Sequence, residues 1–192
     1  MPYTLYPIPG ILMEEIALHI LDIAENSIRA GARKVEIRIE EDPKKDRLTV
    51  VIRDNGEGMD DETQRRLLDP FFTTKEAKQV GLGLPMLAQA ALRAGGKIAI
   101  RSEAGRGTEV KATFQASHID RQPLGDVAET MKALIVGNPE VAFRFVCRGP
   151  GGARRLDTRE IKKALRDVPV NSGEGIGMIR RILEDKGWQS NR

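Results

Sequence analysis

Asp54-Asn55-Gly56-Glu57-Gly58-Met59 decides the fold, because it directly follows residues 48–53, whose apolar side chains alternate as in a half-buried strand. A buried strand that ends at an acid and two glycines places a carboxylate at a cavity, and the glycines allow backbone and ligand to approach closely. Such a carboxylate can accept a hydrogen bond from an exocyclic amine, for example that of adenine. The alternative is a surface turn, in which Asp, Asn and Gly are common.

The composition is that of an ordinary soluble protein with one core, or with one domain and an appendage, at 192 residues, 40% hydrophobic and 31% charged. The 31 basic and 28 acidic residues are scattered along the chain, so no nucleic-acid partner is expected. Neither a membrane span nor a signal pattern is recognisable. One cysteine and two histidines predict no disulfide framework and no zinc site. We therefore expect a cytoplasmic protein that relies on carboxylates, amides and loops.

The first 116 residues show two similar runs of elements. Apolar residues at helical spacing predict a helix over residues 11–30, and a hairpin of strands follows at 34–40 and 48–53. Residues 60–80 are mostly polar and predict a loop. A second helix is expected from Pro85 to Gly95, and a second hairpin at 97–103 and 108–115. This order predicts an α+β sandwich with one antiparallel face.

Residues 117–192 have a different texture and are expected to form a C-terminal αβ extension of unknown role. The pattern predicts a helix at 126–136, a strand at 141–148, a turn at 149–152 and a second short strand. Two further helices are expected, one ending near residue 168 and one at 175–186. These elements could extend the sheet or bind a partner.

Four polar residues, His19, Asp22, Asn26 and Arg29, share one face of the first helix, because they are spaced by three, four and three. Asn is a poor helix former, so Asn26 needs a reason to be there. Its amide oxygen could coordinate Mg²⁺, Arg29 could meet phosphate oxygens, and Asp22 could act as a general base. The alternative is a solvated polar stripe on an amphipathic helix.

Gly81-Leu82-Gly83-Leu84-Pro85 runs directly into the second predicted helix. Free N–H groups at such a start, at the positive end of the helix dipole, suit a polyphosphate. The segment does not match G-x-G-x-x-G, and the chain has no G-x-x-x-x-G-K-[ST], so neither a Rossmann nor a P-loop nucleotide site is predicted.

In order and spacing these segments resemble the GHKL superfamily of ATP-binding domains, which includes gyrase B, Hsp90, histidine kinases and MutL. The Asn-bearing helix is similar to the N box of that family, Asp54–Met59 to its G1 box and Gly81–Leu84 to its G2 box. Pro70-Phe71-Phe72-Thr73-Thr74-Lys75 resembles the F box, and Gly107-Thr108 the last glycine motif. The resemblance covers residues 11–116. It implies the Bergerat fold, an α/β sandwich whose mixed sheet is covered by helices on one face, here with a small C-terminal αβ appendage.

The resemblance also implies ATP and Mg²⁺ as cofactors. Asp54 would bind the adenine amine with Thr108 supporting it, Asn26 would hold Mg²⁺, and residues 60–80 would form a lid over the phosphates. The implied nucleotide-binding residues are Asn26, Arg29, Asp54, Gly56, Gly58, Met59, Lys75, Gly81, Leu82, Gly83, Leu84 and Thr108.

Within the superfamily the features are mixed. Residues 22–32 look like the MutL helix, in which an acid four residues before the Asn activates water. Asp22 is one methylene shorter than the usual Glu, which disfavours efficient hydrolysis. The F and G2 boxes are similar to those of histidine kinases, and Arg29 stands where those kinases usually carry Lys, which is also kinase-like. Because only about 10 residues precede the first helix, no phosphoacceptor hairpin is expected ahead of it. His19 is expected to line the site or pack, and His118 to be a solvated linker residue.

Three functions are consistent with these residues. The first is a stand-alone protein kinase of the histidine-kinase or anti-sigma serine-kinase class, acting in trans on a protein partner with Asp22 as catalytic base. The second is an ATP-driven switch with slow hydrolysis, and the third a non-catalytic nucleotide-binding module. Residues 117–126 look similar to small stand-alone GHKL proteins encoded beside iron-only hydrogenase genes, which would link the module to hydrogenase assembly or regulation. A homodimer is left open, and no nucleic-acid or membrane partner is expected.

Overall fold

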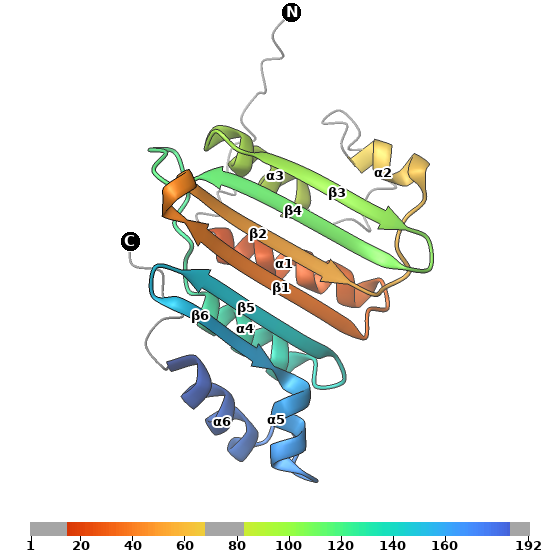
Figure 1. The fold of residues 1–192 in the computed structure, drawn as a ribbon. Coiled ribbons are helices and arrows are strands. Elements are labelled where there is room, and N and C mark those ends of the chain that lie inside the picture. The colour runs from red at the N-terminus through yellow and green to blue at the C-terminus, as the bar shows by residue number, and fades with distance from the viewer. Residues whose placement is uncertain (1–14, 68–82, 185–192) are drawn as a thin grey trace, which may run out of the picture.

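A computed structural model describes residues 15–67 and 83–184 of the chain, and these build one six-stranded sheet with helices against one face (Figure 1). The strand order is β3-β4-β2-β1-β5-β6. All neighbouring strands are antiparallel except β1 and β5, which are parallel, so the sheet is mixed. The predicted fold class is confirmed. The strands are β1 (Lys34–Asp42), β2 (Arg47–Asp54), β3 (Lys97–Glu103), β4 (Gly107–Gln115), β5 (Ala142–Gly149) and β6 (Gly152–Asp157).

The helices that cover the sheet are α1 (Ile16–Arg29), α3 (Gly83–Arg93) and α4 (Val127–Gly137), which lie behind it in Figure 1. The core lies between them and the sheet, because alternate strand residues such as Val35, Ile37 and Ile39 point inward and are at most 2% exposed. Two further helices, α5 (Thr158–Leu165) and α6 (Gly173–Glu184), follow the last strand, and α6 packs on α4. None of the helices in the described ranges has the length and apolar character that a membrane crossing requires.

Part of the predicted loop at residues 60–80 is a helix, α2 (Asp61–Leu67), so the loop prediction is wrong for that segment. The carboxylate of Asp60 accepts a hydrogen bond from the N–H of Thr63 at 2.7 Å, which caps the helix, and Asp61 and Glu62 in its first turn favour the helix dipole. The helix expected at Pro85 begins two residues earlier, at Gly83.

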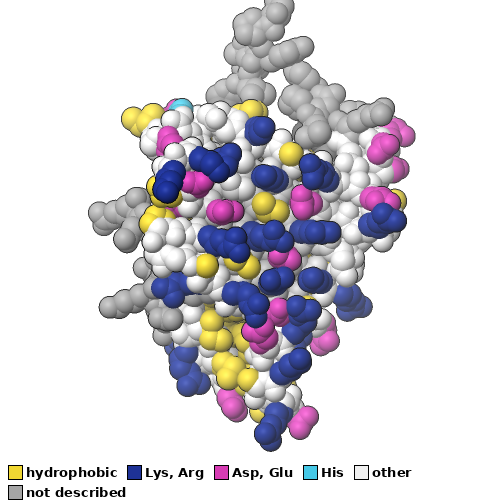
Figure 2. Space-filling model, viewed as in Figure 1, with side chains coloured by type: hydrophobic (Ala, Val, Ile, Leu, Met, Phe, Trp, Pro, Cys, Tyr) yellow, Lys and Arg dark blue, Asp and Glu magenta, His cyan; other side chains and the backbone are white. Residues whose placement is uncertain are grey.

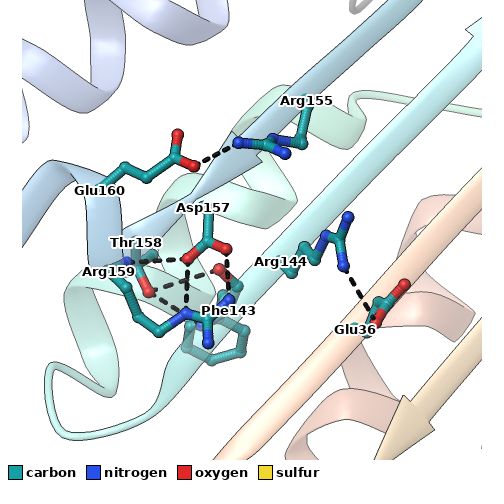
Figure 3. Close-up of polar contacts among 8 residues, drawn as sticks. All are labelled: Glu36, Phe143, Arg144, Arg155, Asp157, Thr158, Arg159 and Glu160. Carbon is teal, nitrogen blue, oxygen red and sulfur yellow. Dashed lines mark hydrogen bonds and ion pairs between the residues drawn. The ribbon is translucent and has the colours of Figure 1, made fainter.

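The C-terminal residues continue the same sheet, since β5 pairs with β1 and the β5–β6 hairpin forms its edge. At the end of β6 the buried Thr158 hydroxyl accepts a hydrogen bond from the N–H of Phe143 in β5, at 2.9 Å (Figure 3). Asp157 accepts from the N–H of Arg159 at 3.0 Å and from its guanidinium at 2.7 Å, and the Arg159 hydrogen bond lowers the pKa of that carboxyl. These contacts hold the start of α5 against β5. The division of the chain at residues 116 and 117 stays a prediction.

Candidate functional site

The carboxylate of Asp54, at the end of β2, is held by three donors from three parts of the chain. Its Oδ1 accepts from the N–H of Gly56 at 2.8 Å and from that of Thr108 at 3.2 Å. Its Oδ2 accepts from the hydroxyl of Ser27 on α1 at 2.7 Å. A carboxylate oxygen accepts about two hydrogen bonds. Oδ1 is therefore saturated, and Oδ2 keeps one acceptor position in a fixed orientation.

Ser27 is a site residue that the sequence reasoning missed. Its hydroxyl lies 2.7 Å from Asp54 Oδ2 and 3.2 Å from the carbonyl oxygen of Ile23 in the preceding turn. A hydroxyl has one proton to donate, and the shorter, charge-assisted contact with Asp54 is the stronger one. The signal was available in part, because Ser in the middle of a helix, directly after Asn26, is not a strong helix former.

Glycines let the Asp54–Met59 turn pack between α1 and the β3–β4 turn. Gly58 has φ +64°, and a Cβ there would lie 2.1 Å from the carbonyl oxygen of Glu103. A Cβ on Gly107, at φ +97°, would lie 2.2 Å from the carbonyl oxygen of Asp54. Only glycine fits such positions, since a left-handed φ and a backbone contact both exclude a side chain. Gly58, a predicted site residue, and Gly107, of the last glycine motif, are therefore needed for the shape of the turn.

Ser102 on β3 joins this turn to α2, and sequence reasoning missed it too. Its hydroxyl accepts from the N–H of Met59 at 2.8 Å and lies 2.8 Å from the hydroxyl of Thr108. The side-chain amide of Gln64 on α2 makes two hydrogen bonds to the Ser102 backbone, at 2.7 Å to its carbonyl and 3.2 Å from its N–H. Thr108 thus supports Asp54 through its backbone N–H, while its hydroxyl contacts Ser102.

Asp22 on α1 lies at the start of α3, where its Oδ2 accepts from the N–H of Gly83 at 2.7 Å. A Cβ on Gly83 would lie 2.0 Å from that oxygen, so the contact requires glycine. A carboxylate at this helix end is stabilised by the helix dipole. Asp22 therefore occupies a donor that the sequence analysis assigned to phosphate.

Asn26 and Arg29 are paired, because the guanidinium of Arg29 donates to Asn26 Oδ1, the oxygen predicted to coordinate Mg²⁺. The described residues contain no cluster of three His, Cys, Asp or Glu side chains that could hold a metal. Mg²⁺ commonly binds through one or two protein oxygens, with phosphates and water completing its coordination. The Asn26 oxygen is a ligand of the kind that such a site uses, and in the structure it is occupied by Arg29.

His19 packs and does not line the site. Its side chain is 1% exposed, and Nε2 lies 3.0 Å from Oε1 of Gln122 in the segment after β4. Burial lowers its pKa below 6.5.

The remaining predicted nucleotide residues are either buried or outside the described part of the chain. Leu84 is buried in the core. Lys75, Gly81, Leu82 and the F box lie outside the described residues, so their predicted contacts stay predictions.

Residues 14–118, more than half of the chain, match the family of histidine kinase-, DNA gyrase B- and HSP90-like ATPases. The chain belongs to this family. The predicted GHKL ATP-binding domain is thereby confirmed, and the arrangement around Asp54 belongs to a domain of this family. The family match ends at residue 118, so the resemblance of the following segment to hydrogenase-linked proteins stays a prediction.

Sensor kinases are among the relatives of this GHKL chain. It is 36% identical over 98 residues to sporulation kinase D of Bacillus subtilis, covering 51% of this chain and 19% of that kinase. It is 36% identical over 110 residues to the sensor protein kinase FleS of Pseudomonas aeruginosa, covering 57% of this chain and 27% of that protein. The chain thus spans less than a third of these relatives. The solved N-terminal domain of a DNA repair protein shares the fold, with a TM-score of 0.52 over 92% of this chain and 59% of that chain, at 15% identity.

Proposed function

We propose that the chain binds Mg-ATP and transfers its γ-phosphoryl group to a protein partner in trans. The observation that carries the nucleotide part is the one open acceptor position on Asp54 Oδ2. An exocyclic amine such as that of adenine donates to a carboxylate, whereas a carbonyl at the same place would be repelled. The three donors hold the carboxylate in one orientation before the base arrives, which favours adenine over guanine.

The phosphates would reach the part of the site formed by α1 and α3. Arg29 is exposed on the last turn of α1, and its guanidinium suits phosphate oxygens, while Asn26 Oδ1 would hold Mg²⁺. The N–H groups at the start of α3 suit an anion. Bound Mg²⁺ would neutralise charge on the transferring phosphoryl group.

Asp22 is the candidate base for the acceptor hydroxyl. In the structure its carboxylate is bound to the N–H of Gly83. A phosphate that accepts from this N–H competes with Asp22, and the released carboxylate can take a proton from a hydroxyl. The same competition favours a second function, an ATP-driven switch, because it changes the contact between α1 and α3 without any phosphotransfer.

Nucleotide binding is tested by titrating a fluorescent ATP analogue with Mg²⁺ into the wild type, Asp54→Ala and Asn26→Ala. Asp46→Ala is a matched control, because Asp46 also accepts from three donors, the N–H and hydroxyl of Ser117 and the amide of Gln115. We expect the two site variants to bind the analogue at least about tenfold more weakly. One charge-assisted hydrogen bond contributes about 1.5–3 kcal/mol, which corresponds to such a loss. The control should keep its affinity. Unchanged affinity in both site variants would show that the site is elsewhere.

Phosphotransfer is tested with γ-labelled ATP, the full chain and proteins that copurify with it. Label on a partner that disappears in Asp22→Asn supports the kinase, because Asn can still accept from Gly83 but cannot act as a base. Free phosphate without labelled protein supports the switch instead. Retained nucleotide binding with neither product leaves a non-catalytic binding module.

A further inference from the structure

The sheet face opposite the helices, here called the open face, carries a concentration of basic side chains (Figure 2). Its outward positions hold ten basic and six acidic residues, a formal charge of +4, which exceeds the +3 of the whole chain. The net positive charge of the chain therefore lies on this face, and the rest of the chain is close to neutral. The ten are Lys34, Arg38, Arg47, Arg53, Lys97, Arg101, Lys111, Arg144, Arg148 and Arg155; the six are Glu36, Glu40, Asp42, Glu103, Glu109 and Asp157.

Strand register arranges these charges in rows across the sheet. One row, here called the charge ladder, alternates basic and acidic residues over all six strands and is neutral as a whole. Opposite charges on neighbouring strands stabilise the sheet. It reads Arg101, Glu109, Arg53, Glu36, Arg144, Asp157. Glu36 Oε2 lies 4.0 Å from Arg144 Nη1 (Figure 3), while Glu36 Oε1 is bound to Arg38 of the adjacent row and Asp157 is bound to Arg159.

The adjacent row, here called the cation row, contains no acid. It reads Ala99, Lys111, Val51, Arg38, Val146, Arg155, so a basic residue on every second strand alternates with a small apolar one. The side chains of Arg38 and Arg155 are 55% and 52% exposed, although they also pair with Glu36 and Glu160. The row is therefore an accessible stripe of positive charge with aliphatic surface between the charges.

A hollow of about 290 Å³ adjoins the cation row where β1, β2, β3 and β4 lie side by side. Basic side chains outnumber acidic ones in it four to two, so an acidic side chain is a suitable guest. The lining residues are Lys45, Arg47, Lys97, Lys111, Glu40, Asp42, Thr49 and Thr113.

We propose that the open face docks an acidic, partly aliphatic helix of a partner protein, laid along the cation row across the strands. Strands are about 4.7–4.9 Å apart, so the three basic residues repeat at about 9.4–9.8 Å. A helix presents residues i and i+7 on one face at about 10.5 Å, with i+3 and i+4 between them. A helix with acidic residues at i and i+7 and aliphatic residues at i+3 and i+4 therefore matches the cation row in both charge and polarity.

Nucleic acid fits this face less well. None of the outward strand positions holds an aromatic side chain on which a base could stack. The charge ladder lies one row away from the cation row and is neutral as a whole, so it adds no net positive charge for the phosphates of a wide duplex. Because the described nucleotide residues lie on α1, α3 and at strand ends, we expect a partner on the open face not to compete with ATP.

The test uses the full chain and a synthetic 21-residue helical peptide with Glu at every seventh position and Leu three and four residues later. Two comparison probes are the same peptide with Lys in place of Glu, and duplex DNA of equal charge. The test variant is Arg38→Glu/Lys111→Glu/Arg155→Glu. The matched control, Arg93→Glu/Lys163→Glu/Arg181→Glu, changes the net charge equally with exposed residues of α3, α5 and α6. Nucleotide affinity and thermal unfolding show that each variant is folded.

We expect the acidic peptide to bind the wild type and the control alike, and the open-face variant about tenfold more weakly, because three attractive charges become three repulsive ones. Binding should weaken as salt shortens the Debye length below about 10 Å. The proposal is overturned if the acidic peptide does not bind the wild type, or binds all variants equally. Tighter binding of DNA, lost in the same variant, would assign the face to nucleic acid and overturn it too.

Discussion

Replacing Ser27 by Ala should destabilise the protein and loosen the orientation of Asp54. Ser27 is 6% exposed, and its hydroxyl donates a hydrogen bond to the Asp54 carboxylate at 2.7 Å. A hydrogen bond to a charged group contributes about 1.5–3 kcal/mol to stability. Ala is a better helix former than Ser by about 0.5 kcal/mol, which offsets part of that loss. The expected loss in the free energy of unfolding is therefore about 1–2.5 kcal/mol.

The same substitution should weaken nucleotide binding. Oδ1 of Asp54 keeps its two backbone donors, so the carboxylate stays in place but can rotate more freely. Fixing a side chain on binding costs about 0.5–1.5 kcal/mol, which corresponds to an affinity about 2- to 10-fold lower. Discrimination between ATP and GTP should fall as well, because the open acceptor position is no longer held in one direction.

Urea unfolding and ATP titration measure these effects, and Ser117→Ala is the matched control. Ser117 also donates its hydroxyl to an aspartate, Asp46 Oδ2, at 2.6 Å, but this pair is exposed and remote from Asp54. The control should lose less stability than Ser27→Ala, because exposed pairs contribute little, and should keep its nucleotide affinity. If the two variants lose equal stability and both bind ATP like the wild type, the reasoning about Asp54 is refuted.

Three further predictions concern the turn and two titrating groups. Gly58→Ala should destabilise the protein by about 1–3 kcal/mol and weaken ATP binding, and in urea unfolding it should lose more than Gly105→Ala, which also has a positive φ but nothing within 4 Å of an added Cβ. Burial lowers the pKa of His19 below 6.5, so protons bind the unfolded chain more strongly in this range, and stability should fall from pH 7.5 to 5.5. In His19→Gln, the unfolding temperature should depend less on pH over the same range. Arg159 lowers the pKa of Asp157, so the contribution of this carboxylate to stability is present above its unfolded pKa of 3.8 and is lost as the pH falls. In urea unfolding, Asp157→Asn should be less stable than the wild type at pH 7, and the difference should shrink below pH 4.

The parts of the fold that could be predicted are those encoded by neighbouring residues. The predicted strand at 97–103 has its observed bounds, because Ile98 and Ile100 stand at alternate positions and glycines lie before the strand and in the turn after it. The turn after β2 was predicted for the same reason, since the acid and the glycines that shape it lie within six residues. Recognising this turn as part of a GHKL site required the order of several motifs along the chain.

Helix α2 could not be predicted in this way, because its seven residues, DETQRRL, carry almost no apolar periodicity. Its observed contacts include an N-terminal cap by Asp60 and the pairing of Gln64 with the backbone of Ser102, 38 residues away. A helix this short is marginal without tertiary contacts. Such a contact depends on how β3 is placed, which a local pattern does not contain.

The same limit explains why Ser102 and the cation row were missed. Alternation along a strand predicts that Lys111 and Arg38 point outward, but not that they lie in one row, because the row depends on the register between strands. Basic residues that look scattered from position 38 to position 155 are neighbours once the register is known. A scattered sequence therefore does not exclude a basic surface, because the register of a sheet brings residues of distant strands into one row. In a sheet, partner surfaces have to be read across strands.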